Sequence, residues 1–123
     1  MLELTIRRAS EEIGWRMTSE YEHGLCFLSF HRKTLSGVPF CFSVETEDYE
    51  LDNVIREILS FVDALDPKLC AWEWMVKSGV VHPSMYNIAI SDMDEIRTQA
   101  WLLACNLSEL ENGLLSDYSL NLL

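Results

Sequence analysis

The first third of the chain is dominated by patterns typical of β-strands. Apolar and polar residues alternate in the segments 2–8 (LELTIRR) and 13–21, as in a strand with one buried face. The segments 24–32 and 38–46 are rich in aromatic and β-favouring residues. Between them lies 33–37 (KTLSG), which ends in glycine and has an ordinary length for a hairpin connection. This part of the chain is therefore predicted to form three or four strands.

The pattern changes near residue 48, where apolar residues begin to recur at steps of three and four. This spacing predicts a helix over 49–65, with Asp48 as its cap. Asp66 and Pro67 then suit the N-cap and first position of a second helix. Gly79 is expected to end this second helix.

A third helix is predicted to begin at Ser91, which has an acidic residue three positions on, and to end at Asn112–Gly113. The residues 114–123 are expected to form an apolar C-terminal tail that packs on this domain or on a neighbour. The apolar residues on one face of the helix are Ile96, Ala100, Leu103, Leu107 and Leu110.

The order of these elements predicts an α+β fold in a single domain over residues 1–123. The sheet is expected within 1–47 and the helices within 48–113, followed by the tail. Since strands come first and helices afterwards, an antiparallel sheet of three or four N-terminal strands should be covered on one face by three C-terminal helices.

Composition places the chain among folded cytoplasmic proteins. Hydrophobic residues make up 49% of it, and no apolar run approaches the length of a membrane span. The N-terminus lacks the basic start and apolar stretch of a signal peptide. No membrane partner is therefore expected.

The four cysteines lie in separate apolar segments, with no C-x-x-C pair. They are expected to be buried free thiols. A bridge between Cys26 and Cys41 is the alternative, because the two residues lie on neighbouring predicted strands. The other two cysteines, Cys70 and Cys105, lie in the later part of the chain.

The net negative charge of the chain comes entirely from residues 41–123. Residues 1–40 carry five cationic and five anionic side chains, whereas 41–123 carry four cationic and fifteen anionic ones, which gives the net charge of −11. Phosphate backbones would be repelled, so no nucleic-acid partner is expected. The same charge leaves open an acidic mimic of nucleic acid that occupies a basic groove on another protein.

No pattern of residues points to catalysis, and no catalytic, metal-binding or cofactor-binding residue is predicted. His23, His31 and His82 are scattered, without the spacing of metal ligands. The acidic segment 45–52 lacks the residue order and the glycine of a calcium-binding loop. Because the glycines do not cluster, a phosphate-binding loop is not expected either. The protein is therefore not expected to be an enzyme.

The segment 69–77 is apolar around most of the circumference of a helix, with only Glu73 and Lys77 charged. Trp72 and Trp74 lie about 160° apart on it, so both cannot lie at the centre of one buried face. One interpretation is a central helix covered on both sides. The other is that part of this surface forms an interface.

The interface hypothesis is favoured because a small domain has too little interior to bury a second apolar face on every helix. We expect a non-enzymatic domain that forms a homo-oligomer, and one origin of such a surface is design on a natural scaffold. The alternative is a natural protein that binds another protein. The predicted interface residues are Trp72, Trp74, Met75, Met85 and Ile88.

Overall fold

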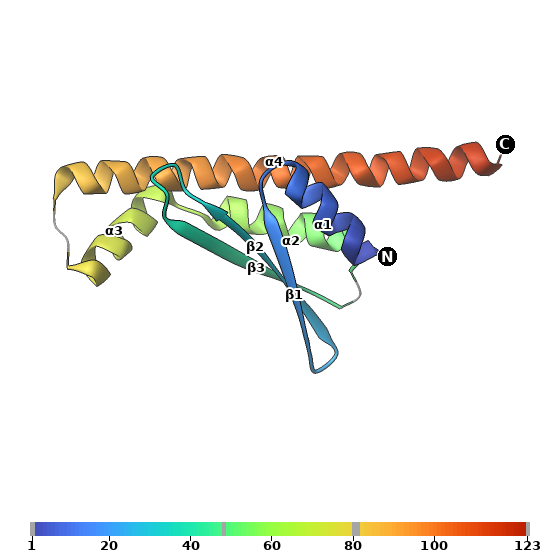
Figure 1. The fold of residues 1–123 in the computed structure, drawn as a ribbon, viewed down its shortest axis with the longest axis horizontal. Coiled ribbons are helices and arrows are strands. Elements are labelled where there is room, and N and C mark those ends of the chain that lie inside the picture. Colours follow the sequence, from blue (N-terminus) through green and yellow to red (C-terminus); the bar gives the residue numbers. More distant parts are fainter. Residues whose placement is uncertain (1, 48, 80–81, 123) are drawn as a thin grey trace.

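The computed structural model describes the backbone of residues 2–47, 49–79 and 82–122, and side chains within these ranges as far as residue 112. A long helix runs the length of the molecule, and the other elements pack along it (Figure 1). In chain order the elements are α1 (Leu2–Glu12), β1 (Arg16–Glu22), β2 (Leu25–Lys33), β3 (Pro39–Thr46), α2 (Leu51–Ala64), α3 (Pro67–Ser78) and α4 (Pro83–Leu122).

The first element is a helix, α1, so the strand predicted over 2–8 is wrong. Ile6, Ala9 and Ser10 are buried, at the steps of three and four that a helix requires, whereas Leu4 is exposed. Arg7 donates to Glu3 one turn earlier, at 2.9 Å. Three alternating apolar residues are too few to separate a strand from the first turns of an amphipathic helix.

The remaining three predicted strands form one antiparallel sheet in the order β1-β2-β3. Its pleat sends alternate residues to opposite faces, and helices cover one face only (Figure 1). The predicted α+β layout is therefore confirmed. The buried face consists of Met17, Cys26, Leu28, Phe30, Phe42, Val44 and Thr46.

Helix α2 covers this face with Leu51, Val54 and Ile58, all of which are buried. Its N-cap is Glu50, whose side chain makes no capping hydrogen bond. Asp48, the predicted cap, lies outside the described residues. The hydrophobic periodicity alone was therefore enough to place this helix.

Helix α3 begins and ends where its capping residues predict. The side chain of Asp66 accepts hydrogen bonds from the backbone N–H groups of Lys68 and Leu69, at 3.1 and 3.2 Å. Gly79 follows the helix with a φ of 69°, the left-handed conformation that favours glycine.

Helix α4 is continuous from Pro83 to Leu122, so the predicted start at Ser91 and end at Asn112–Gly113 are both wrong. His82 caps it: its carbonyl and ring nitrogen accept hydrogen bonds from the first turn. Capping residues permit a helix end without forcing one, and one interior glycine costs only about 1 kcal/mol. The predicted packing of side chains 114–123 lies outside the described residues.

The predicted buried face of α4 is confirmed, because Ile96, Ala100, Leu103 and Leu107 are fully buried and Leu110 packs beside them. None of the helices in the described ranges combines the length and apolarity needed to cross a bilayer.

Candidate functional site

Helix α3 packs on α4 through a narrow buried stripe. Its buried residues are Pro67, Ala71 and Met75, spaced one turn apart. Met75 is only 4% exposed, so its predicted place on an accessible interface is wrong. The other sides of α3 remain outside the core, so this helix is not central although it is apolar nearly all round.

One exposed side of α3 forms an apolar ridge, which we define as Leu69, Trp72 and Val76. The three side chains are 52%, 56% and 63% exposed. Their spacing of three and four residues places them on one face of the helix, with no charged residue among them. This is the arrangement by which a helix typically anchors in a groove of a partner.

The ridge is anchored on α4 by an aromatic contact. The rings of Trp72 and Tyr86 meet edge to face, with centroids 6.5 Å apart and an interplanar angle of 90°. Because Tyr86 is half-buried in the first turn of α4, Trp72 is held in a defined position although most of its surface is exposed.

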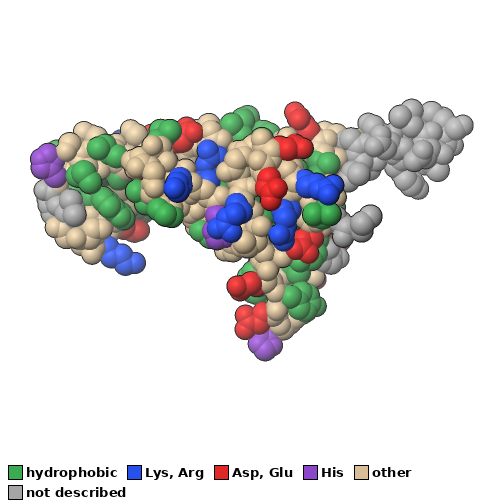
Figure 2. Space-filling view, viewed as in Figure 1, with side chains coloured by type: hydrophobic (Ala, Val, Ile, Leu, Met, Phe, Trp, Pro, Cys, Tyr) green, Lys and Arg blue, Asp and Glu red, His purple; other side chains and the backbone are tan. Residues whose placement is uncertain are grey.

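The opposite side of α3 borders a cavity of about 500 Å³, here named the apolar groove. It lies between α3, the first turns of α4 and the residues that connect β2 with β3. Hydrophobic side chains gather at this end of the molecule in Figure 2. Three of the five predicted interface residues, Trp74, Met85 and Ile88, line the groove, together with Val38, Pro39 and Phe40.

A polar contact fixes one wall of the groove. The carboxylate of Asp92 in α4 accepts hydrogen bonds from the backbone N–H of Ser36, at 3.1 Å, and from the Ser36 hydroxyl. Asp92 is buried, and the bonds tie the β2–β3 connection to the helix. The groove is therefore built between connected elements that hold its shape without a partner.

Cys70 also lines the groove and behaves there as an apolar side chain. Burial raises the pKa of its thiol, and the negative charges of Glu73 and Asp66 raise it further. The thiol thus stays neutral at physiological pH, as suits an apolar wall.

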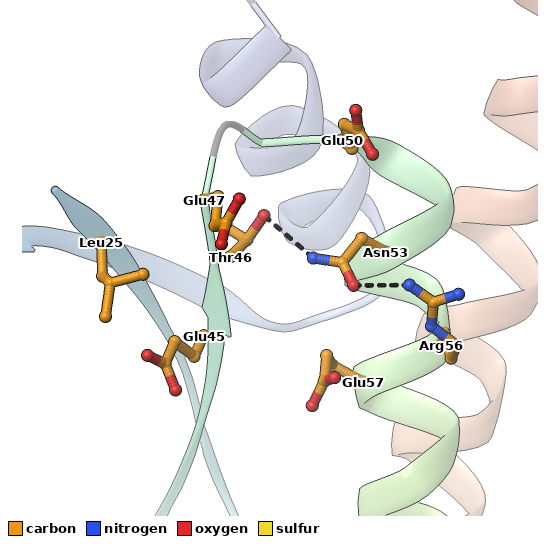
Figure 3. Close-up of a pocket in the computed structure, with 8 residues that line it drawn as sticks. All are labelled: Leu25, Glu45, Thr46, Glu47, Glu50, Asn53, Arg56 and Glu57. Atoms are coloured by element: carbon orange, nitrogen blue, oxygen red, sulfur yellow. Dashed lines mark hydrogen bonds between the residues drawn. The ribbon is translucent and has the colours of Figure 1, made fainter.

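A second cavity, of about 430 Å³, lies between the end of β3 and the start of α2 (Figure 3). Asn53 links the two elements, since it donates to Thr46 at 3.3 Å and accepts from Arg56 at 2.8 Å. In the described part of the chain, carboxylates, histidines and cysteines do not gather into a group of three that could hold a metal ion. The acidic residues lining the cavity are Glu45, Glu47, Glu50 and Glu57.

The cysteines are free thiols, but they are not uniformly buried. Cys26 lies on the buried face of the sheet, whereas Cys41 is exposed on the open face. Because the two side chains point to opposite faces, the alternative of a bridge between them does not apply. Cys70 and Cys105 are half-buried.

No family model, curated protein or solved structure matches this chain. Sequence reasoning singled out Trp72, Trp74, Met85 and Ile88, and it missed the contribution of residues 34–40. The only sequence signal for that contribution was the apolar VPF at 38–40, directly after a turn.

Proposed function

We propose that this protein is a self-associating domain that forms a homo-oligomer by seating the apolar ridge of one copy in the apolar groove of the next. The observation that carries the proposal is that one chain presents both halves of such a contact. Trp72 projects from one side of α3, and Trp74 lines the groove on the other side.

Burial of these side chains would supply substantial binding energy. Fully burying a large apolar side chain stabilises by about 1.5–3 kcal/mol relative to exposure. Tryptophan and methionine are also enriched at protein contacts, where a few central aromatic residues carry most of the affinity.

The charge distribution favours a second copy of this chain as the partner. Residues 67–90 carry two lysines and one glutamate, whereas the rest of the chain carries seven cationic and nineteen anionic side chains. Two copies with a net charge of −11 repel each other over most of their surface. The α3 end carries little negative charge, so two copies could approach there with the least repulsion between carboxylates.

The placement of ridge and groove favours a head-to-tail arrangement. Trp72 and Trp74 point in directions about 160° apart on the helix. A two-fold dimer would use the same patch twice, whereas a ridge in a groove uses two different patches and leaves one of each free. Repeated contacts then close into a ring or continue as a filament.

The experiment is size-exclusion chromatography with light scattering at tens of micromolar. We expect the wild type to be larger than a monomer. The double variant Trp74→Glu with Met85→Arg blocks the groove and should be monomeric by light scattering and folded by circular dichroism. The ridge variant Trp72→Glu should behave in the same way. The matched control is Trp101→Glu, at an exposed tryptophan of α4 outside ridge and groove, which should keep the parent mass.

Mixing the two monomeric variants tests the head-to-tail arrangement directly. The ridge variant retains a groove and the groove variant retains a ridge, so an equal mixture should form a complex with the mass of one copy of each. A mixture that stays monomeric contradicts ridge-in-groove packing. A wild type that is monomeric at these concentrations overturns self-association altogether.

A further inference from the structure

A third cavity, of about 410 Å³, lies at the end of the sheet where β1 and β3 begin and β2 ends, and residues from both faces of the sheet line it. Three of the nine cationic side chains of this acidic protein line it: Arg16, Arg32 and Lys33. Figure 2 shows Lys and Arg side chains gathered around a histidine near the middle of the molecule. Among the described residues that line the cavity there is no carboxylate.

The register of the sheet creates this cluster. Arg16 pairs with His31, and His31 pairs with Cys41, so the three residues form one row across the open face. Lys33 lies two residues beyond His31 and therefore on the same face. The ring of His31 is oriented by the hydroxyl of Thr18, 3.0 Å from its Nε2 atom.

Arg32 approaches the cavity from the other side and is held in place. Its guanidinium lies over the ring of Trp15, 5.1 Å from the centroid, and donates to the side chain of Gln99 at 3.2 Å. Its Nε atom is buried and has no hydrogen-bond partner in the described structure. The cation is thus positioned by neutral groups, and its charge is not neutralised by them.

Within the described part of the chain, none of these three cations forms an ion pair. The chain has twenty carboxylates with which to compensate them. Three like charges around one cavity repel one another, so a bound anion would relieve a cost that the protein otherwise bears.

We propose that this cavity binds the phosphate group of a small organic phosphate. Three cations suit a dianion better than a carboxylate, which one arginine can pair with. The cavity is larger than a phosphate ion, and Pro39 and Phe40 supply an apolar wall for the organic part. Nucleic acid is disfavoured because the chain as a whole carries a net charge of −11, which repels a long polyanion.

The test is calorimetric titration at low ionic strength with phenyl phosphate, inorganic phosphate and benzoate. Phenyl phosphate should bind most tightly, with benzoate at least about tenfold weaker. The variants Arg16→Gln and Lys33→Gln, both at exposed positions, should each weaken phenyl phosphate binding about tenfold or more, because each removes a charge-assisted contact. Arg8→Gln, an exposed cation outside the cavity, is the matched control and should leave the affinity unchanged.

A second readout locates the ligand. Cys41 lines the cavity, so phenyl phosphate should slow alkylation of Cys41 by neutral iodoacetamide, whereas Cys70 in the apolar groove should react at an unchanged rate. If none of the three probes binds, the proposal is overturned. It is also overturned if Arg8→Gln loses as much affinity for phenyl phosphate as Arg16→Gln and Lys33→Gln do. Equal binding of benzoate overturns the preference for a dianion, and a single-stranded oligonucleotide that binds more tightly than phenyl phosphate overturns the choice of a small molecule.

Discussion

The indole N–H of Trp15 donates to the backbone carbonyl of Gln99 at 3.1 Å, across 84 residues of sequence. Trp15 is fully buried just before β1, and Gln99 lies in the middle of α4. The bond therefore fixes the start of the sheet to the long helix. Arg32 contacts both residues, so the same junction also positions the cavity lined by Arg16, Arg32 and Lys33, here named the basic cavity.

Replacing Trp15 by Phe should destabilise the protein by roughly 1–3 kcal/mol, because it removes this hydrogen bond and leaves a gap in a close-packed site. Urea unfolding followed by circular dichroism measures the change, at one protein concentration since self-association alters apparent stability. The control Trp101→Phe, at an exposed indole, should change stability by less than about 0.5 kcal/mol. Equal unfolding midpoints for the two variants would contradict the role of Trp15.

Two neighbouring leucines of α4 should respond very differently to truncation. Leu103 is 0% exposed and Leu102 is 40% exposed. Leu103→Ala should cost about 2–5 kcal/mol, since it leaves a cavity between α4 and the rest of the core. Leu102→Ala should have a much smaller effect on the same unfolding curve. Similar losses would mean that α4 is rotated relative to the structure described.

Removing the cap of α3 should weaken both the helix and the proposed assembly. Asp66→Ala deletes the acceptor for two backbone N–H groups and should cost about 1 kcal/mol. Amide hydrogen exchange at Lys68 and Leu69 should accelerate, and the oligomer should dissociate at a higher protein concentration than the parent. Asp63→Ala, an exposed aspartate near the end of α2, is the control expected to change neither measurement.

Glu3 should contribute to a loss of stability in acid. The hydrogen bond from Ser19, together with contacts to Arg7, holds the pKa of the Glu3 carboxyl below its ordinary value. A lowered pKa in the folded state stabilises the protein above the unfolded-state value of about 4.3, and this contribution disappears as the pH falls through the folded-state value. The carboxylate is partly exposed, so the contribution should be at most about 1 kcal/mol.

The matched variant for this effect is Glu3→Gln. It should be less stable than the wild type near pH 7, and the difference should shrink as the pH falls through the lowered folded-state pKa of Glu3 and the wild-type carboxyl becomes protonated in both states. Thermal unfolding across a series of pH values measures it. A difference that persists in acid would assign the role of Glu3 to packing.

Alkylation should distinguish the cysteines by position. In the ligand-free protein Cys41 should react first, because it is exposed, and Cys26 should react only on unfolding. Cys70 should react slowly near neutral pH, since its raised pKa lowers the thiolate fraction. Mass mapping of peptides after brief treatment with iodoacetamide measures the order. Early labelling of Cys26 would contradict its place on the buried face.

The sequence by itself determined the elements whose signals are local and repeated. Helices α2 and α3 and the strands β2 and β3 lie where periodicity, turns and caps place them. The stripe from Ile96 to Leu107 is buried as its spacing predicts. Such signals suffice because each repeats along its element or is reinforced by a turn or a capping side chain.

Local signals failed where two structures satisfy the same few residues. In 2–8 the three alternating apolar residues suit a strand, and the tertiary structure selects a helix because it buries Ile6 and Ala9 against the core. The start of α4 was misplaced for a similar reason: Ser91 has the chemistry of a cap but is an exposed residue within a continuous helix.

Only the tertiary structure decided which apolar and charged residues meet. Met75 turns into the core while Trp72 and Trp74 stay outside it, and the connection between β2 and β3 completes the groove. The basic cavity was hidden in a sequence region without net charge, because Arg16 and Lys33 are separated along the chain and come together through antiparallel pairing. Periodicity reports which face of an element is apolar, whereas contacts between distant segments depend on register and packing that no local pattern encodes.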